Sequence, residues 1–143
     1  MQTTTRYVAG FLFDSALAEV ALIRKNKPAW QSGLLNGIGG KIETGETALD
    51  AMLREFNEET GADVRGWKHF ALLKGADFSV DFFAHIGDLS GLKSQEEEKI
   101  EIVRVDDIVV CQGGMVENVP WLIGLALDHL SDGRPHFVAV QYL

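Results

Sequence analysis

The stretch from Gly40 to Ala62, GKIETGETALDAMLREFNEETGA, contains the strongest local signals in this chain of 143 residues. Apolar residues recur at helical spacing over Thr47–Thr60, which predicts a helix with one apolar face. These residues are Ala48, Leu49, Met52, Leu53 and Phe56. Thr47 and Asp50 have the spacing of a capping box at the helix start. Gly61 is a favourable residue just beyond the helix end.

Three carboxylates of this helix, Glu55, Glu58 and Glu59, are spaced so that they share one face. Like charges at this spacing destabilise a helix by about 0.2–0.5 kcal/mol per pair, and the negative end of the helix dipole adds to the repulsion. A bound divalent cation such as Mg²⁺, which prefers oxygen ligands, would reverse this effect. A solvated acidic face is the alternative that the spacing alone leaves open.

Glycines are dense directly before the helix, in the segment NGIGGK from Asn36 to Lys41. This density predicts a loop whose backbone can approach a ligand or a metal closely. A plain turn is the alternative. The segment is not a Walker A loop, because no Gly-Lys-Ser/Thr follows at the required spacing.

The complete pattern of Gly40–Ala62 resembles the signature of the Nudix hydrolase family, G-x5-E-x7-R-E-U-x-E-E-x-G-U, where U is apolar. Every position matches, although two apolar positions hold residues less usual than Leu, Ile or Val. With average residue frequencies, the chance of such a match is on the order of 10⁻⁷, which rules out a merely solvated face. The matching residues are Gly40, Glu46, Arg54, Glu55, Phe56, Glu58, Glu59, Gly61 and Ala62.

The resemblance implies a single Nudix domain over 1–143, with an α/β/α sandwich built on a mixed sheet. Family members hydrolyse a nucleoside diphosphate linked to another group, usually with Mg²⁺ or Mn²⁺. By this resemblance, Glu55, Glu58 and Glu59 are expected to be catalytic and to bind the metal, with the Gly40 carbonyl as a further ligand. Glu55 is the candidate for activating water.

Two further expectations about the metal site follow from the resemblance. Glu46 and Arg54 would form an internal ion pair with a structural role. An additional acidic ligand often comes from a loop outside the signature, and Glu96–Glu98 (EEE) precedes an expected strand at Val103. Aligning that strand favours Glu97, with Glu98 next, while a solvated charge run remains the alternative for at least one of the three.

The substrate is addressed by residues outside the signature. The segment Leu34–Ile42 resembles the loop of MutT-type 8-oxo-dGTP pyrophosphohydrolases, in which an asparagine at the position of Asn36 helps to recognise a purine. An amide offers both a donor and an acceptor to a base edge, although a turn asparagine before glycine is the alternative. The other expected substrate-binding residues are Lys41, Asn118 and Trp121.

Aromatic and absent residues add to the substrate prediction. Trp30 can stack on a base or pack, and Trp121 can equally belong to the core. ADP-ribose-type members often carry a proline after the signature, but none occurs between Pro28 and Pro120. Dinucleoside-polyphosphate-type members often carry a tyrosine there, but the only tyrosines are Tyr7 and Tyr142. These gaps favour a purine (d)NTP, oxidised or not, cleaved to a monophosphate and pyrophosphate.

Bulk properties limit the partners. The net charge of −8 disfavours a nucleic acid polymer, and neither a signal peptide nor a membrane span is expected. The single cysteine, Cys111, cannot form an internal disulfide, so we expect a cytoplasmic protein. By the resemblance, its expected partners are small nucleotides. The oligomeric state stays open. The competing class is a non-catalytic nucleotide-binding sensor, which usually loses signature acids that this chain keeps.

The rest of the chain predicts strands around these residues and one more helix. The loop before the glycines spans Lys25–Gly33, and a short acidic turn is expected at Asp106 and Asp107. The second helix is expected over Pro120–Leu130, with proline in its first turn. The expected strands are Tyr7–Phe13, Val20–Arg24, Trp67–Lys74, Phe78–Ile86, Val103–Val105 and Phe137–Tyr142.

Overall fold

The computed structural model describes residues 3–110, 113–131 and 135–143, and Cys111 lies outside them. The helices are α1 (Ala48–Thr60), α2 (Val105–Val110) and α3 (Val119–Ser131), together with a short 3₁₀ helix, η1 (Ala29–Gln31). The strands are β1 (Thr5–Phe13), β2 (Glu19–Arg24), β3 (Leu35–Asn36), β4 (Ile38–Lys41), β5 (Lys68–Lys74), β6 (Phe78–Ile86), β7 (Lys99–Arg104) and β8 (Val138–Gln141).

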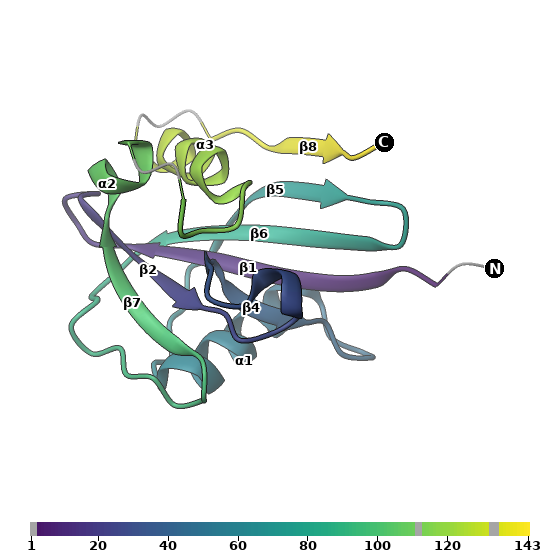
Figure 1. Ribbon diagram of the computed structural model, residues 1–143, viewed down its shortest axis with the longest axis horizontal. Coiled ribbons are helices and arrows are strands. Elements are labelled where there is room, and N and C mark those ends of the chain that lie inside the picture. The colour runs from purple at the N-terminus through teal and green to yellow at the C-terminus, as the bar shows by residue number, and fades with distance from the viewer. Residues whose placement is uncertain (1–2, 111–112, 132–134) are drawn as a thin grey trace.

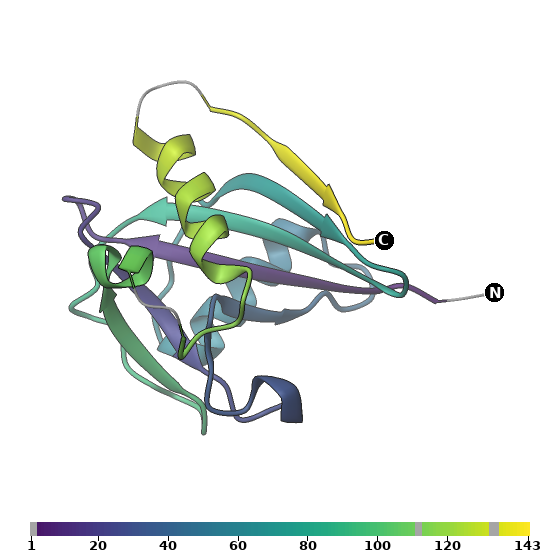
Figure 2. The same ribbon diagram turned by 45° about the horizontal axis from the view of Figure 1, so that its top comes forward.

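The strands form one mixed sheet, in which β1 lies at the centre. The hydrogen-bonded order is β3-β2-β1-β6-β5-β8, with β4 also paired to β1 and β7 to β2. The β1–β6 and β5–β8 pairs are parallel, and the others are antiparallel. Helix α3 covers one face of the sheet and α1 the other (Figures 1 and 2). The predicted α/β/α sandwich is therefore confirmed.

The central strand is apolar from Val8 to Phe13 because both of its faces are buried there. Phe11 and Phe13 point into the core beneath α2 and α3, whereas Val8 and Leu12 point into the core beneath α1. A strand covered on both sides loses the polar alternation of a half-exposed strand. Residues of β1 at even positions therefore mark the α1 side of the sheet.

Helix α1 has the caps that the sequence predicts. The Thr47 side chain accepts a hydrogen bond from the Asp50 backbone, the Asp50 side chain accepts one from Thr47, and Gly61 ends the helix in the left-handed region with φ 77°. The apolar face packs against β1 at Gly10, where a Cβ would come within 2.5 Å of Met52 Cε. Glycine at this point lets the helix lie close to the sheet.

The glycine-rich segment before the helix is not the loop that we predicted. It forms β3 and β4, and β4 pairs with β1 so that Gly39 lies opposite Ala9 and Gly40 opposite Val8. A Cβ at Gly39 would overlap with the carbonyl oxygen of Val8. The glycine therefore allows close backbone contact inside a sheet, a role that composition alone does not distinguish from a turn.

The expectation around residues 103–107 is also partly wrong. The strand β7 begins earlier, at Lys99, and ends at Arg104, so Val105 belongs to α2 instead. The acidic turn is the first turn of that helix, where Asp106 and Asp107 suit the positive end of the helix dipole. The other predicted strands and both main helices are present within one or two residues of their predicted ends. Among the described residues, no helix is long and apolar enough to cross a membrane.

Candidate active site

An arginine clamp holds the segment before α1 against the helix. Arg54 donates from Nε to Glu46 Oε2 at 2.8 Å, from Nη2 to Glu46 Oε1 at 2.9 Å, and from Nη2 to the Lys41 carbonyl at 3.0 Å. These hydrogen bonds from Arg54, with one from the Glu43 backbone, lower the pKa of Glu46 to about 2. The paired acid raises the pKa of Arg54 in turn. The pair therefore connects the loop to the helix.

The Glu55 carboxylate lies directly against the backbone of β4. A Cβ at Gly40 would be 2.5 Å from Glu55 Oε1, so only glycine leaves room for this carboxylate. Burial raises the pKa of Glu55, Arg54 opposes this through a 2.8 Å hydrogen bond from Nη1, and the Glu58 charge raises it further. A carboxylate held in this way is a candidate to take a proton from a bound water.

Glu59 carries the least compensated charge of the site. Its Oε2 atom is buried and has no hydrogen-bond partner within the part of the chain that the structure describes. Burial and the neighbouring charges of Glu98, Glu55 and Glu96 raise its pKa to about 7. Such an orphaned acid is destabilising unless a cation neutralises it.

Glu58 lies closer to solvent on the same helix face. Its side chain is half exposed, and Oε2 is 3.4 Å from Arg54 Nη1. The three helix acids thus lie side by side, as their spacing predicts, but they differ in burial. Glu59 and Glu55 form the enclosed part, and Glu58 forms the rim.

Of the three acids in the 96–98 run, Glu98 is the one held in place. It accepts hydrogen bonds from Lys25 Nζ at 3.0 Å and from the Asn26 backbone at 2.6 Å. Burial alone would raise the pKa of Glu98, but these bonds lower it overall. Glu97 is exposed and makes no hydrogen bond or ion pair with the described residues. Its assignment as a metal ligand therefore has no contact in its support.

The donor set fits a hard divalent cation that keeps part of its water shell. It consists of carboxylate oxygens, including the orphaned Oε2 of Glu59, beside the bare backbone of Gly40. Among the described residues, no three His, Cys, Asp or Glu side chains converge on one point. Mg²⁺ commonly takes only one or two protein carboxylates and completes its octahedron with water and substrate phosphates.

Asn36 is fixed on both sides of its amide. The Oδ1 atom accepts from the Gly37 backbone at 2.8 Å, and Nδ2 donates to Gln31 Oε1 at 3.0 Å. The amide keeps one N–H and one lone pair for a ligand. Sequence reasoning did not single out Gln31, because a polar residue in a loop carries no distinguishing pattern. Trp30, its neighbour in η1, is 67% exposed, so it is not packed in the core.

The segment before α3 joins the same end of the sheet. Leu35 donates to the Gly114 carbonyl, and the Val116 backbone donates to Leu35, each at 2.9 Å, which places this segment beside β3. Asn118 follows and is half-buried. Trp121, which we considered as a possible core residue, is 40% exposed on α3. Lys41 is exposed at the end of β4, and its carbonyl is its contact with the site, through Arg54.

Comparisons with known proteins agree with this arrangement. The sequence model of the NUDIX domain family matches residues 3–121 of this chain. A MutT structure from a comparison of Aliivibrio salmonicida and Vibrio cholerae has a TM-score of 0.73 and 25% identity, covering 88% of this chain and 99% of that one. An ADP-ribose pyrophosphatase from Streptococcus suis has a TM-score of 0.72 and 18% identity, covering 96% and 99%.

A third similar structure is the NUDIX domain of NrtR from Shewanella oneidensis, in complex with ADP ribose. Its TM-score is 0.78 at 15% identity, covering 92% of this chain and 91% of that one. No curated protein sequence matches the chain significantly. Two of these three structures thus carry ADP-ribose in their names, and the third is named MutT.

Proposed function

Since this chain belongs to the NUDIX domain family, we propose that it hydrolyses purine (d)NTPs, oxidised or not, to a monophosphate and pyrophosphate with Mg²⁺ or Mn²⁺. The family and the similar structures show that the protein is a hydrolase of pyrophosphate-containing substrates. Nudix hydrolases generally use divalent metal ions.

One observation carries the metal-dependent part of the proposal. The buried and unpartnered oxygen of Glu59 lies among the charges of Glu55 and Glu98. Without a cation this arrangement is repulsive, and a sequence selected only for stability gains nothing from it. We assign Glu58, Glu59 and Glu55 as the residues that hold the metal, with the Gly40 backbone beside them.

A pyrophosphate linkage resists hydrolysis because its oxygens repel an attacking hydroxide. Bound divalent ions supply charge neutralisation and orientation of the attacking water. Glu55 is the residue best placed to take the proton of that water, since burial raises its pKa and Gly40 leaves it room. Arg54 keeps this carboxylate in position and holds Glu46 so that the preceding loop stays fixed.

We propose Glu98 as the additional acidic ligand in preference to Glu97, which the position of the expected strand at Val103 favoured. Glu98 is preorganised by Lys25 and two backbone N–H groups, and its charge acts on Glu59. Glu97 has neither property. Replacing Glu98 by Gln is therefore expected to reduce turnover more than the same change at Glu97, and the reverse order would restore the first assignment.

The base is assigned to the end of the sheet that carries Asn36. Its remaining amide N–H and lone pair can bond a purine edge, and the segment leading to Asn118 lies alongside. The exposed indoles of Trp30 and Trp121 offer surfaces for stacking. Lys41, exposed at the end of β4, is assigned to the substrate phosphates.

The test is turnover of a nucleotide panel with Mg²⁺ or Mn²⁺: dGTP, 8-oxo-dGTP, the other dNTPs, ADP-ribose and dinucleoside polyphosphates. The proposal expects the highest kcat/KM for a purine triphosphate, with pyrophosphate as product. A higher kcat/KM for ADP-ribose or a dinucleoside polyphosphate would contradict the proposed triphosphate substrate and identify that compound as the substrate class instead. Tight nucleotide binding without any turnover would indicate a sensor.

A further inference from the structure

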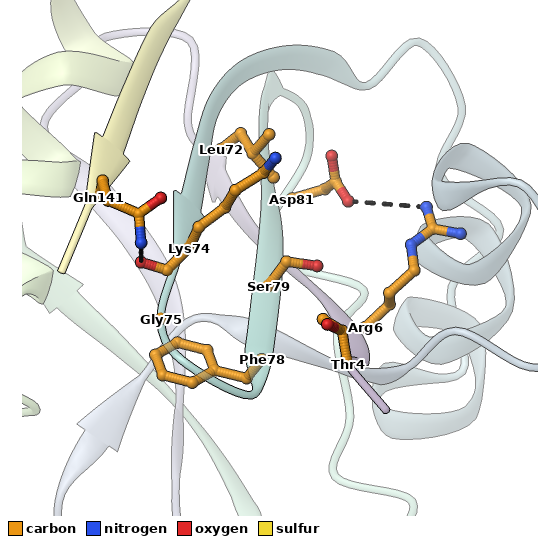
Figure 3. A pocket seen from close by; sticks show the side chains of 9 residues that line it. All are labelled: Thr4, Arg6, Leu72, Lys74, Gly75, Phe78, Ser79, Asp81 and Gln141. Atoms are coloured by element: carbon orange, nitrogen blue, oxygen red, sulfur yellow. Dashed lines mark hydrogen bonds and ion pairs between the residues drawn. The ribbon is translucent and has the colours of Figure 1, made fainter. Parts of the chain in front are cut away.

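A polar cavity lies away from the carboxylates, on the part of the sheet that α1 leaves uncovered. Its volume is about 370 Å³, at the lower end of the range for small-molecule sites. It shares no residue with the site described above. Figure 3 shows its lining, which comes from β1 and the residue before it, from β5, β6 and β8, and from the turn between β5 and β6.

The sheet register places four polar side chains abreast across this cavity. Arg6 is paired with Ser79, Ser79 with Lys74, and Lys74 with Gln141. Directly paired residues point to the same face of a sheet, and neighbouring strands are about 4.8 Å apart. The backbones of Arg6 and Lys74 are therefore about 10 Å apart. Figure 3 shows Ser79 between their side chains.

The positive charge of this row is incompletely neutralised. Arg6 has one ion pair, to Asp81 Oδ2 at 4.0 Å, while the other oxygen of Asp81 is 2.9 Å from His69 Nε2. Lys74 Nζ has no ion pair or hydrogen bond among the described residues. By contrast, carboxylates lie 3.0 Å from Lys25 and 2.8 Å from Arg54.

The Ser79 hydroxyl is a further unused donor. The residue is only 8% exposed, and its side chain makes no hydrogen bond within the described parts of the chain. In a protein with a net charge of −8, a hollow lined by two cations, one carboxylate and a free hydroxyl is locally positive. These donors come from three adjacent strands and line one face of the hollow.

We propose that this cavity is a second binding site, for a small phosphate-bearing anion. The guanidinium of Arg6 bonds phosphate oxygens through its fixed fork, and Lys74 acts as a point charge. The proposal is independent of which pyrophosphate substrate the carboxylate site cleaves, because no group is shared.

The test is a titration of the ¹⁵N-labelled full chain with inorganic phosphate in EDTA, followed by amide chemical shifts. Saturable shifts at Ser79, Lys74 and Gln141 are expected. Lys74→Gln should weaken binding roughly tenfold, as expected for one lost charge-assisted bond. Lys68→Gln, the same change at an exposed position on the same strand, should leave the affinity unchanged.

Parallel titrations with pyrophosphate and a nucleoside monophosphate identify the source of the phosphate group. Tighter binding of the monophosphate would assign the site to a nucleotide, and equal or tighter binding of phosphate or pyrophosphate to a free inorganic anion. Three results would overturn the proposal. They are no shifts at the lining residues, equal weakening by Lys68→Gln, and equal binding of acetate at matched ionic strength.

Discussion

Arg54 holds Glu46 through two parallel hydrogen bonds, Nε to Oε2 at 2.8 Å and Nη2 to Oε1 at 2.9 Å. The same guanidinium reaches the Lys41 carbonyl and the Glu55 carboxylate. One side chain thus connects the loop before α1, the end of β4 and the proposed proton acceptor. A planar fork is required for this, because an ammonium group cannot bond both oxygens in fixed directions.

Arg54→Lys should therefore destabilise the protein although the charge is kept. Losing a paired charge-assisted bond is expected to lower the Tm by roughly 6 °C. Thermal denaturation measures this. Arg65→Lys is the control, because its ion pair with Asp63 is exposed and worth little. Equal Tm changes in the two variants would contradict the clamp.

Gly40→Ala should remove activity while leaving the fold intact. The new methyl group would lie 2.5 Å from Glu55 Oε1, so the carboxylate must move. A displacement of about 1 Å at a catalytic group reduces turnover by about 10²-fold. Gly91→Ala is the matched control, since nothing lies within 4 Å of a Cβ there. Normal kcat in Gly40→Ala would show that Glu55 need not stay against the backbone.

Helix α1 and the glycine segment before it show which features the sequence could and could not predict. The capping box at Thr47, the stop at Gly61 and the shared face of Glu55, Glu58 and Glu59 depend on residues a few positions apart, and all are present. The spacing of nearby residues was therefore sufficient to predict these features. The loop prediction at Gly39 was wrong for the same reason. The residue whose backbone requires glycine there is Val8, 31 positions earlier, and a local pattern does not include it.

Glu98 illustrates the same limit within the site. A run of three adjacent glutamates gives no local reason to choose one of them. The choice depends on Lys25 and the Asn26 backbone, more than seventy positions earlier, which β2 brings next to the start of β7. The positive row of Arg6 and Lys74 was likewise unpredictable, because it exists only through the register of β1, β6 and β5.

Stability without metal should fall as pH rises, in part through Glu59. Its pKa in the folded protein is about 7, above the ordinary value of 4.5. Below about pH 4.5 the acid is protonated in both states, so there is no penalty. Between pH 4.5 and 7 the unfolded state releases the proton first, and folding loses stability, which then stays lost at higher pH.

The variant Glu59→Gln should consequently be more stable than the wild type at pH 8 in EDTA, by about 1 kcal/mol after solvent screening. The difference should disappear at pH 4. Adding Mg²⁺ at pH 8 should raise the wild-type Tm more than that of the variant. Glu19→Gln, at an exposed position, is the control. Equal Tm values of variant and wild type at pH 8 would argue against a buried charge.

Asn36→Ala should separate base recognition from a turn role. The variant is expected to raise KM about tenfold for purine triphosphates, as for one lost base-edge contact, and to affect pyrimidines less. Steady-state kinetics on dGTP and dCTP give both values. An equal rise for both nucleotides would indicate that Asn36 only positions Gly37 and Gln31.

The central claim is that the acids of α1 form a metal-dependent pyrophosphohydrolase site, and product analysis tests it most directly. With Mg²⁺ and dGTP, the wild type and Glu19→Gln should release pyrophosphate and dGMP at the same rate. Glu58→Gln and Glu59→Gln should reduce kcat by roughly 10³-fold while remaining folded. Release of inorganic phosphate instead of pyrophosphate, or near-normal turnover in both variants, would contradict the account.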